Sequence, residues 1–170
     1  MVQVLAATEM LESAASSPRQ SLRGLVEKAR SETFFDHHIT KTPLVIRFVP
    51  IEREELATIQ KKHGLVDTDD PFSEKNYISY CDIIIACCEG IYIKQDGDLI
   101  PALGLDPAPT FESDELHEDL DVDIVLGESP VDAVKALFPF DLIVLRLGNE
   151  ILQFSMGVES DVQDNIRGNS

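Results

Sequence analysis

An acidic stretch in the second half of the chain places the strongest constraint on how this sequence can fold. Residues 106–123 contain eight carboxylates and one histidine, with no lysine or arginine among them. Mutual repulsion favours an extended, hydrated conformation, so we expect residues 104–128 to form an acidic connector between packed elements. Within it, residues 112–120 have the spacing of a weak helix only.

The charge of the whole chain is equally uneven. Residues 1–94 carry 11 basic and 14 acidic residues, whereas residues 95–170 carry 3 basic and 17 acidic residues. The net charge of −17 therefore comes mostly from the second half. A surface of this sign repels phosphate backbones and anionic lipid heads, so we expect a protein partner and neither nucleic acid nor a membrane.

The composition predicts one folded domain. The chain has 170 residues, of which 44% are hydrophobic, and this content is sufficient for a core. No apolar run approaches the ~20 residues of a membrane span. The N-terminus has no basic region before its apolar stretch, so we expect a cytoplasmic protein. Residues 1–16 and 158–170 are expected to fray.

The three cysteines, Cys81, Cys87 and Cys88, have the spacing of neither a disulfide framework nor a zinc knuckle. On a helix, Cys81 and Cys88 would share a face but lie two turns apart, roughly 10 Å, which is too far for a disulfide. We therefore expect all three to be reduced thiols in the core.

The first quarter of the chain predicts one helix and one strand. Ser17 and Pro18 begin the helix, because serine caps free N–H groups and proline fits the first helical position. Residues 33–41 are predicted to be a loop, and residues 44–49 a strand bounded by prolines.

Two helices and a hairpin follow. Residues 51–63 predict a surface helix, because acidic side chains begin it, basic side chains end it and Gly64 terminates it. Residues 72–89 predict a more buried, central helix with apolar residues at helical spacing, and the isoleucines also permit a strand at residues 82–86. The Asp-Gly pair in the middle of residues 91–102 is typical of a β-hairpin.

The last quarter predicts two more helices. Ser129 caps the first, which ends before Pro139, and Asp141 begins the second, which ends at Gly157. The chain is thus predicted to be a mainly helical α+β protein. It has about five helices and a small sheet made of the 44–49 strand and the 91–102 hairpin.

Two patterns resemble metal sites. Asp36, His37 and His38 match a triplet found in metal-dependent phosphoesterases, but no aspartate precedes them to complete such a site. Asp119, Asp121 and Asp123 resemble the start of a calcium loop whose required glycine and glutamate are missing, as the sixth position is isoleucine and the twelfth is proline. No glycine-rich phosphate loop or nucleophile motif occurs, so we expect a protein without catalytic residues, metal or cofactor.

Three segments resemble a known family. They are PLVIRFVPIEREEL at residues 43–56, SEKNYISYCDIIIACCEGIYIKQDGDLIPA at residues 73–102 and ALFPFDLIVLRLGNEILQFSMGVESDV at residues 136–162. Together they look like tail assembly chaperones of long-tailed siphophages, in particular those that infect actinobacteria. The family pattern is an extended segment before a proline, a short charged helix, an apolar helix leading into a hairpin, an acidic middle and a closing helix.

The resemblance implies a non-catalytic protein that binds tape-measure and tail-tube proteins during virion assembly in the host cytoplasm, with self-association possible in principle. Two alternatives stay open, a structural tail or connector subunit of the virion and a small metal-dependent hydrolase that uses the Asp-His-His triplet. The residues predicted to bind a partner are four acids and three apolar residues of the last helix: Glu112, Asp114, Glu115, Glu118, Leu147, Ile151 and Phe154.

Overall fold

The structure is a computed structural model that describes Gly24, Lys28, Ala29 and residues 32–65, 67, 69–125 and 128–168, with side chains up to residue 157. The chain divides into two compact units, residues 1–32 and residues 33–170. In the first unit Gly24, Lys28 and Ala29 are helical. The rest of the predicted first helix and the predicted frayed segment 1–16 lie outside the described residues. That the whole chain is a single domain stays a prediction.

The second unit is a mainly helical α+β fold, as the sequence predicts. Its described strands form one antiparallel sheet in the order β1-β2-β3-β4. These strands are β1 (Phe35–His38), β2 (Leu44–Phe48), β3 (Cys88–Gln95) and β4 (Asp98–Pro101). The described α-helices are α3 (Arg53–His63), α4 (Glu74–Cys87), α5 (Asp114–Asp119), α6 (Ser129–Leu137) and α7 (Asp141–Gly168). A 3₁₀ turn, η1 (Ala102–Gly104), follows β4.

The hairpin and the first two helices of this unit form where the sequence predicts them. Asp96 and Gly97 join β3 to β4 with φ values of 52° and 94°, the left-handed conformation that a tight hairpin turn requires. Gly64 ends α3 with a φ of 81°. The Ser73 hydroxyl begins α4 by accepting a hydrogen bond from the Asn76 backbone N–H at 3.2 Å.

The prediction of a loop at residues 33–41 is wrong, because this segment contains the edge strand β1. Two cross-strand contacts to β2 stabilise it. The Phe35 ring lies 5.5 Å from the Phe48 ring, and the Asp36 carboxylate accepts two hydrogen bonds from the Arg47 guanidinium, at 2.8 and 3.0 Å. Aspartate disfavours strands locally, so the strand is evident only from these tertiary contacts.

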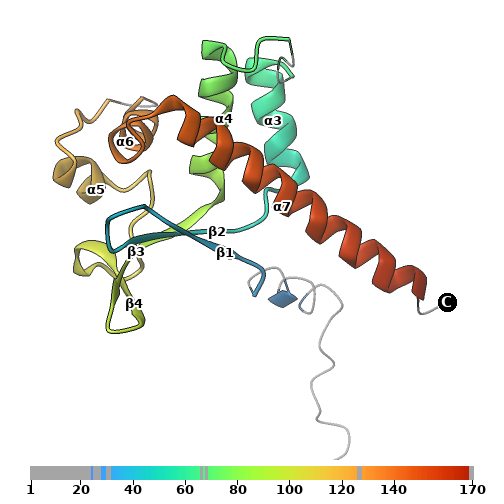
Figure 1. The fold of residues 1–170 in the computed structure, drawn as a ribbon, viewed down its shortest axis with the longest axis horizontal. Coiled ribbons are helices and arrows are strands. Elements are labelled where there is room, and N and C mark those ends of the chain that lie inside the picture. The colour runs from blue at the N-terminus through green and yellow to red at the C-terminus, as the bar shows by residue number, and fades with distance from the viewer. Residues whose placement is uncertain are drawn as a thin grey trace, which may run out of the picture. The chain divides into compact units, whose positions relative to one another are not determined.

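The core lies between the sheet and the helices packed on it. Figure 1 shows α7 crossing α4, with α6 at the start of α7 and the sheet below them. Ile46, Phe48 and Ile91 supply the sheet side of the core. On the helical side, α4 contributes Ile84, and α6 and α7 contribute further buried residues: Val134, Val144, Leu147 and Ile151.

The acidic segment is more integrated into this core than expected. Phe111 and Leu116 are 0% and 4% exposed, and the neighbouring His117 is also buried. The Phe111 ring lies 6.5 Å from the ring of Phe138, at the end of α6. The expectation of an extended, hydrated connector is therefore wrong for residues 111–119, because their apolar side chains face inward while the acids face water.

Two helix ends also differ from the predictions. The last helix does not end at Gly157 but continues to Gly168, and Gly157 lacks the positive φ of a terminating glycine. Glu128, not Ser129, occupies the N-cap of α6. The Ser129 hydroxyl instead accepts a hydrogen bond from the Val125 backbone N–H at 2.6 Å. None of the helices described by the structure is long and apolar enough to span a membrane.

The crossing of α4 and α7 depends on a residue without a side chain. A Cβ atom at Gly148 would lie 2.3 Å from Cδ1 of Tyr80. We predict that Gly148→Ala lowers the free energy of unfolding by about 1–3 kcal/mol in urea denaturation, because the Tyr80 ring must shift. Adding Tyr80→Ala should recover part of this loss, so that the double variant is more stable than additivity predicts.

Gly157→Ala is the matched control, because a Cβ atom at this position of α7 meets nothing within 4 Å. It should stabilise the protein by roughly 0.5–1 kcal/mol through helix propensity alone. Equal effects of the two substitutions would contradict the close packing at Gly148.

Candidate functional site

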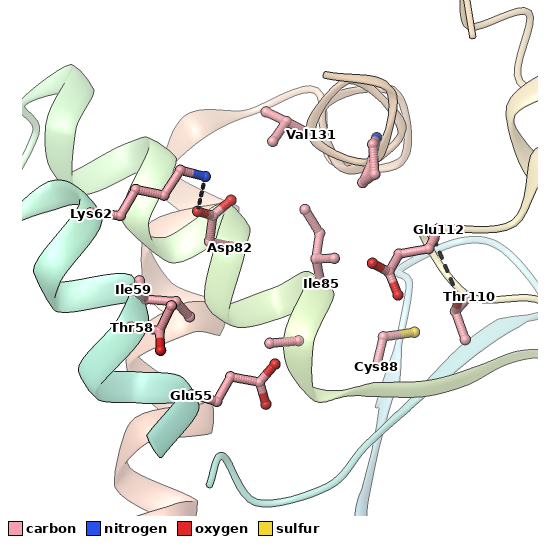
Figure 2. Close-up of a pocket in the computed structure, with 12 residues that line it drawn as sticks. Glu55, Thr58, Ile59, Lys62, Asp82, Ile85, Cys88, Thr110, Glu112 and Val131 are labelled. Atoms are coloured by element: carbon pink, nitrogen blue, oxygen red, sulfur yellow. Dashed lines mark hydrogen bonds and ion pairs between the residues drawn. The ribbon is translucent and has the colours of Figure 1, made fainter. Parts of the chain in front are cut away.

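A pocket of about 410 Å³ lies between α3, α4, the start of α6 and the segment that enters α5 (Figure 2). We name it the acidic pocket. Glu55 and Lys62 line it from α3, and Asp82 lines it from α4. The remaining lining residues are Thr58, Ile59, Ile85, Ala86, Cys88, Thr110, Glu112, Pro130 and Val131.

The charges at one end of the acidic pocket are paired within the chain. Lys62 Nζ lies 2.9 Å from Asp82 Oδ2, and His63 Nε2 lies 2.7 Å from the same oxygen. Lys62 and His63 both lie in the last turn of α3. Basic side chains at this end of a helix interact favourably with the negative end of the helix dipole. This end of the pocket is therefore electrostatically satisfied.

The other end of the acidic pocket holds two exposed carboxylates, those of Glu55 and Glu112. Glu55 and Glu112 point into the pocket from opposite sides in Figure 2, and no described cation forms an ion pair with either of them. Burial raises the pKa of the Glu55 carboxyl, and the negative charges of Glu52 and Glu112 raise it further. The protein thus disfavours the charged form of Glu55 relative to a free carboxylate.

The four acids predicted to bind a partner are all exposed. Glu112, Asp114, Glu115 and Glu118 form what we name the acidic surface, on α5 and the residues before it. Beneath them, the buried His117 ring is fixed by Nε2, which lies 2.7 Å from the Phe111 carbonyl oxygen. The acidic surface is therefore anchored to the core, and Glu112 belongs both to it and to the acidic pocket.

Of the three apolar residues predicted to bind a partner, two are buried and the third is half-buried. Leu147 and Ile151 are 1% and 0% exposed and belong to the core. Phe154 is half-buried, and its ring packs edge-on against Phe35 of β1 at 5.0 Å. In this fold Phe154 packs on the sheet, whereas Leu147 and Ile151 are enclosed in the core, so a partner has no access to these two residues.

The Asp-His-His triplet is placed on a strand, where successive side chains point to opposite faces. Asp36 is held by Arg47 on β2, whereas His37 faces the Phe138 ring at 6.0 Å. Burial lowers the pKa of His37. Across the described ranges, no three His, Cys, Asp or Glu side chains gather where they could hold a metal ion, including the Asp119, Asp121 and Asp123 series.

The three cysteines are buried, free thiols, as predicted. Burial raises the pKa of Cys81 to about 11 and those of Cys87 and Cys88 to about 12. The thiolate, which is the nucleophile, is therefore scarce at neutral pH, and these residues serve packing.

No family model, no curated protein and no solved structure matches this chain. The pocket itself was not predicted from the sequence, because its two unpaired carboxylates lie on segments far apart in the chain. The local signal is that Glu55 shares a helix face with the buried Ile59, one turn later.

We predict that Glu55→Gln raises the thermal midpoint at pH 7. The folded state raises the pKa of this carboxyl, so its charged form destabilises the fold at pH values above that pKa. The gain should shrink as the pH falls through the folded pKa, and vanish where the carboxyl is protonated in both states. Glu54→Gln, which makes the same charge change outside the pocket, should not give this gain in parallel scans from about pH 7 to about pH 4.

We also predict that the thiols react slowly with Ellman's reagent in the folded protein. At pH 8 the raised pKa values of all three groups reduce the thiolate population, so the rates should be about a hundredfold or more below those in guanidinium chloride. Rapid reaction of any one thiol under native conditions would contradict its burial.

Proposed function

We propose that this chain is a non-catalytic tail assembly chaperone of a long-tailed phage, which binds tape-measure and tail-tube proteins in the host cytoplasm. The three segments that resemble the family coincide with the scaffold of the fold. They form β2 with the start of α3, then α4 with β3 and β4, and finally the end of α6 with α7. Such a correspondence is what a shared fold would require.

The observation that carries the proposal is the anchored acidic surface. Buried Phe111 and Leu116 hold the segment in place, and the four carboxylates face outward from it. A fixed patch of one sign attracts a cationic partner over long range and keeps the complex soluble. A chaperone for assembly proteins needs both properties.

Asp36, His37 and the three cysteines, which are among the described side chains with catalytic potential, make structural contacts. Asp36 is paired with Arg47, His37 packs against Phe138, and the cysteine thiols are buried and protonated at neutral pH. These roles favour binding over turnover as the function of this fold.

The test is co-expression with the products of the neighbouring reading frames, followed by affinity capture. We predict that the variant Glu112→Gln, Asp114→Asn, Glu115→Gln, Glu118→Gln captures the partner roughly tenfold less well at low salt. Its thermal midpoint should stay close to that of the wild type, because exposed carboxylates contribute little to stability.

A control variant neutralises four exposed acids on other elements: Glu54→Gln, Asp69→Asn, Asp98→Asn and Glu150→Gln. It has the same net charge as the first variant and should retain capture. If both variants lost capture equally, the loss would be due to the change in net charge. This result would contradict a specific role for the acidic surface. Symmetric stoichiometry in purified mature particles would instead identify a structural subunit of the virion.

A further inference from the structure

We propose that His117 and Asp114 form a pH-sensitive ion pair beneath the acidic surface. When Nδ1 of the buried His117 ring takes up a proton, the Asp114 carboxylate turns inward and accepts a hydrogen bond from it. When Nδ1 carries no proton, the carboxylate faces water. This conformational device belongs to the fold itself and does not depend on which partner the chain binds.

The observation that carries the proposal is a buried nitrogen atom without a hydrogen-bond partner. His117 is 2% exposed, and Nδ1 of its ring is the one buried side-chain nitrogen or oxygen in the described part of the chain that lacks a partner. Buried polar atoms in native proteins are nearly always satisfied, so an exception requires an explanation. Packing alone explains why the ring is buried, but not why Nδ1 is left unpaired.

The other ring nitrogen determines the chemistry of Nδ1. Nε2 lies 2.7 Å from the Phe111 carbonyl oxygen, which can only accept a hydrogen bond, so Nε2 carries the proton. A neutral histidine ring holds one proton, which leaves Nδ1 as an acceptor. Nδ1 therefore becomes a donor only when the ring takes up a second proton and is charged.

The Asp114 carboxylate is placed to respond to that change. Its Oδ1 atom lies 4.0 Å from Nδ1, and its side chain is 75% exposed. An unprotonated Nδ1 and a carboxylate are both acceptors, so they form no hydrogen bond and stay apart. A protonated Nδ1 attracts the carboxylate to the separation of about 2.7–2.9 Å that is typical of a charge-assisted hydrogen bond. Because the Asp114 side chain is exposed, it can rotate without displacing the core.

The other charged groups near α5 leave Asp114 as the partner of the ring. Among the described residues, no second carboxylate lies within 4.0 Å of His117. On α6, which lies beside α5 in Figure 1, Asp132 and Lys135 are exposed and lie 3.7 Å from each other. The remaining charged side chains of the neighbouring segments are also exposed: Glu112, Glu115, Glu118, Asp119, Asp121, Asp123 and Glu128. Their negative charges favour a charged ring from a distance, where solvent and salt screen them.

The pair links the acidity of the solution to one position of the acidic surface. The charged ring gains a partner only in the folded chain, so the pair contributes to stability at low pH, and this contribution is lost as the pH rises. At neutral pH, Asp114 faces water together with the other acids of the surface. In acid, it is held against the ring and strengthens the attachment of α5 to the core.

The test measures the thermal midpoint of the full chain and of the variant Asp114→Asn at about pH 8 and about pH 5.5, which bracket the range in which histidine ordinarily titrates. We predict that the substitution lowers the midpoint by at least about 2 °C more at the lower pH. In the background of His117→Gln, the effect of Asp114→Asn should be the same at both pH values. Glutamine can still donate to the Phe111 carbonyl oxygen, but it has no nitrogen that titrates in this range.

The matched control is Glu115→Gln, which removes the neighbouring exposed carboxylate of α5 and leaves Asp114 in place. Its effect on the midpoint should be the same at both pH values. The proposal is overturned if Glu115→Gln shows the same pH dependence as Asp114→Asn, if Asp114→Asn shows none, or if its pH dependence persists in the His117→Gln background.

Nuclear magnetic resonance of the wild-type chain tests the pair without any substitution in the core. Long-range ¹H–¹⁵N correlations of the His117 ring should show the proton on Nε2 at about pH 8. On acidification, the side-chain carboxylate carbon signal of Asp114 should change together with the Nδ1 signal, whereas that of Glu115 should not follow it. A proton on Nδ1 at about pH 8, or an Asp114 signal that does not follow Nδ1, would refute the ion pair.

Discussion

The close approach of α7 to α4 at Gly148 fixes the positions of most other elements in the second unit. The Tyr80 ring occupies the space that a side chain at residue 148 would need, so the two helices can cross in direct contact. Helix α4 continues into β3 without a loop, since Cys87 ends the helix and Cys88 begins the strand. The position of α7 relative to the sheet therefore follows from this crossing. Helix α6, one wall of the acidic pocket, is tied to it because only three residues separate α6 from α7.

In the acidic segment, burial of apolar side chains favours a packed structure and repulsion between carboxylates opposes it. Burying Phe111 and Leu116 contributes about 1.5–3 kcal/mol for each side chain. Repulsion between carboxylates on the water-exposed side is screened by solvent and salt, and each pair contributes about 1 kcal/mol or less. The burial of each inward apolar residue thus outweighs the repulsion within any one pair of carboxylates, and hydrogen bonds such as that between His117 and the Phe111 carbonyl add to it. The same packing presents the acids in a fixed arrangement.

The parts of the fold that the sequence predicts are those with a local physical cause. The charges at the two ends of α3 and the Asp96-Gly97 turn act within a few residues, and both were predicted. Strand β1 was not predicted, because the ion pair that stabilises it joins Asp36 to Arg47, eleven positions later in the chain. The acids of the candidate surface were also predicted, since exposure follows from their charge.

The acidic pocket was beyond prediction for the same physical reason, because Glu55 and Glu112 meet only once the whole core has formed. In the folded protein, burial and then the charges of Glu52 and Glu112 raise the pKa of the Glu55 carboxyl, an effect that no sequence pattern around Glu55 reveals.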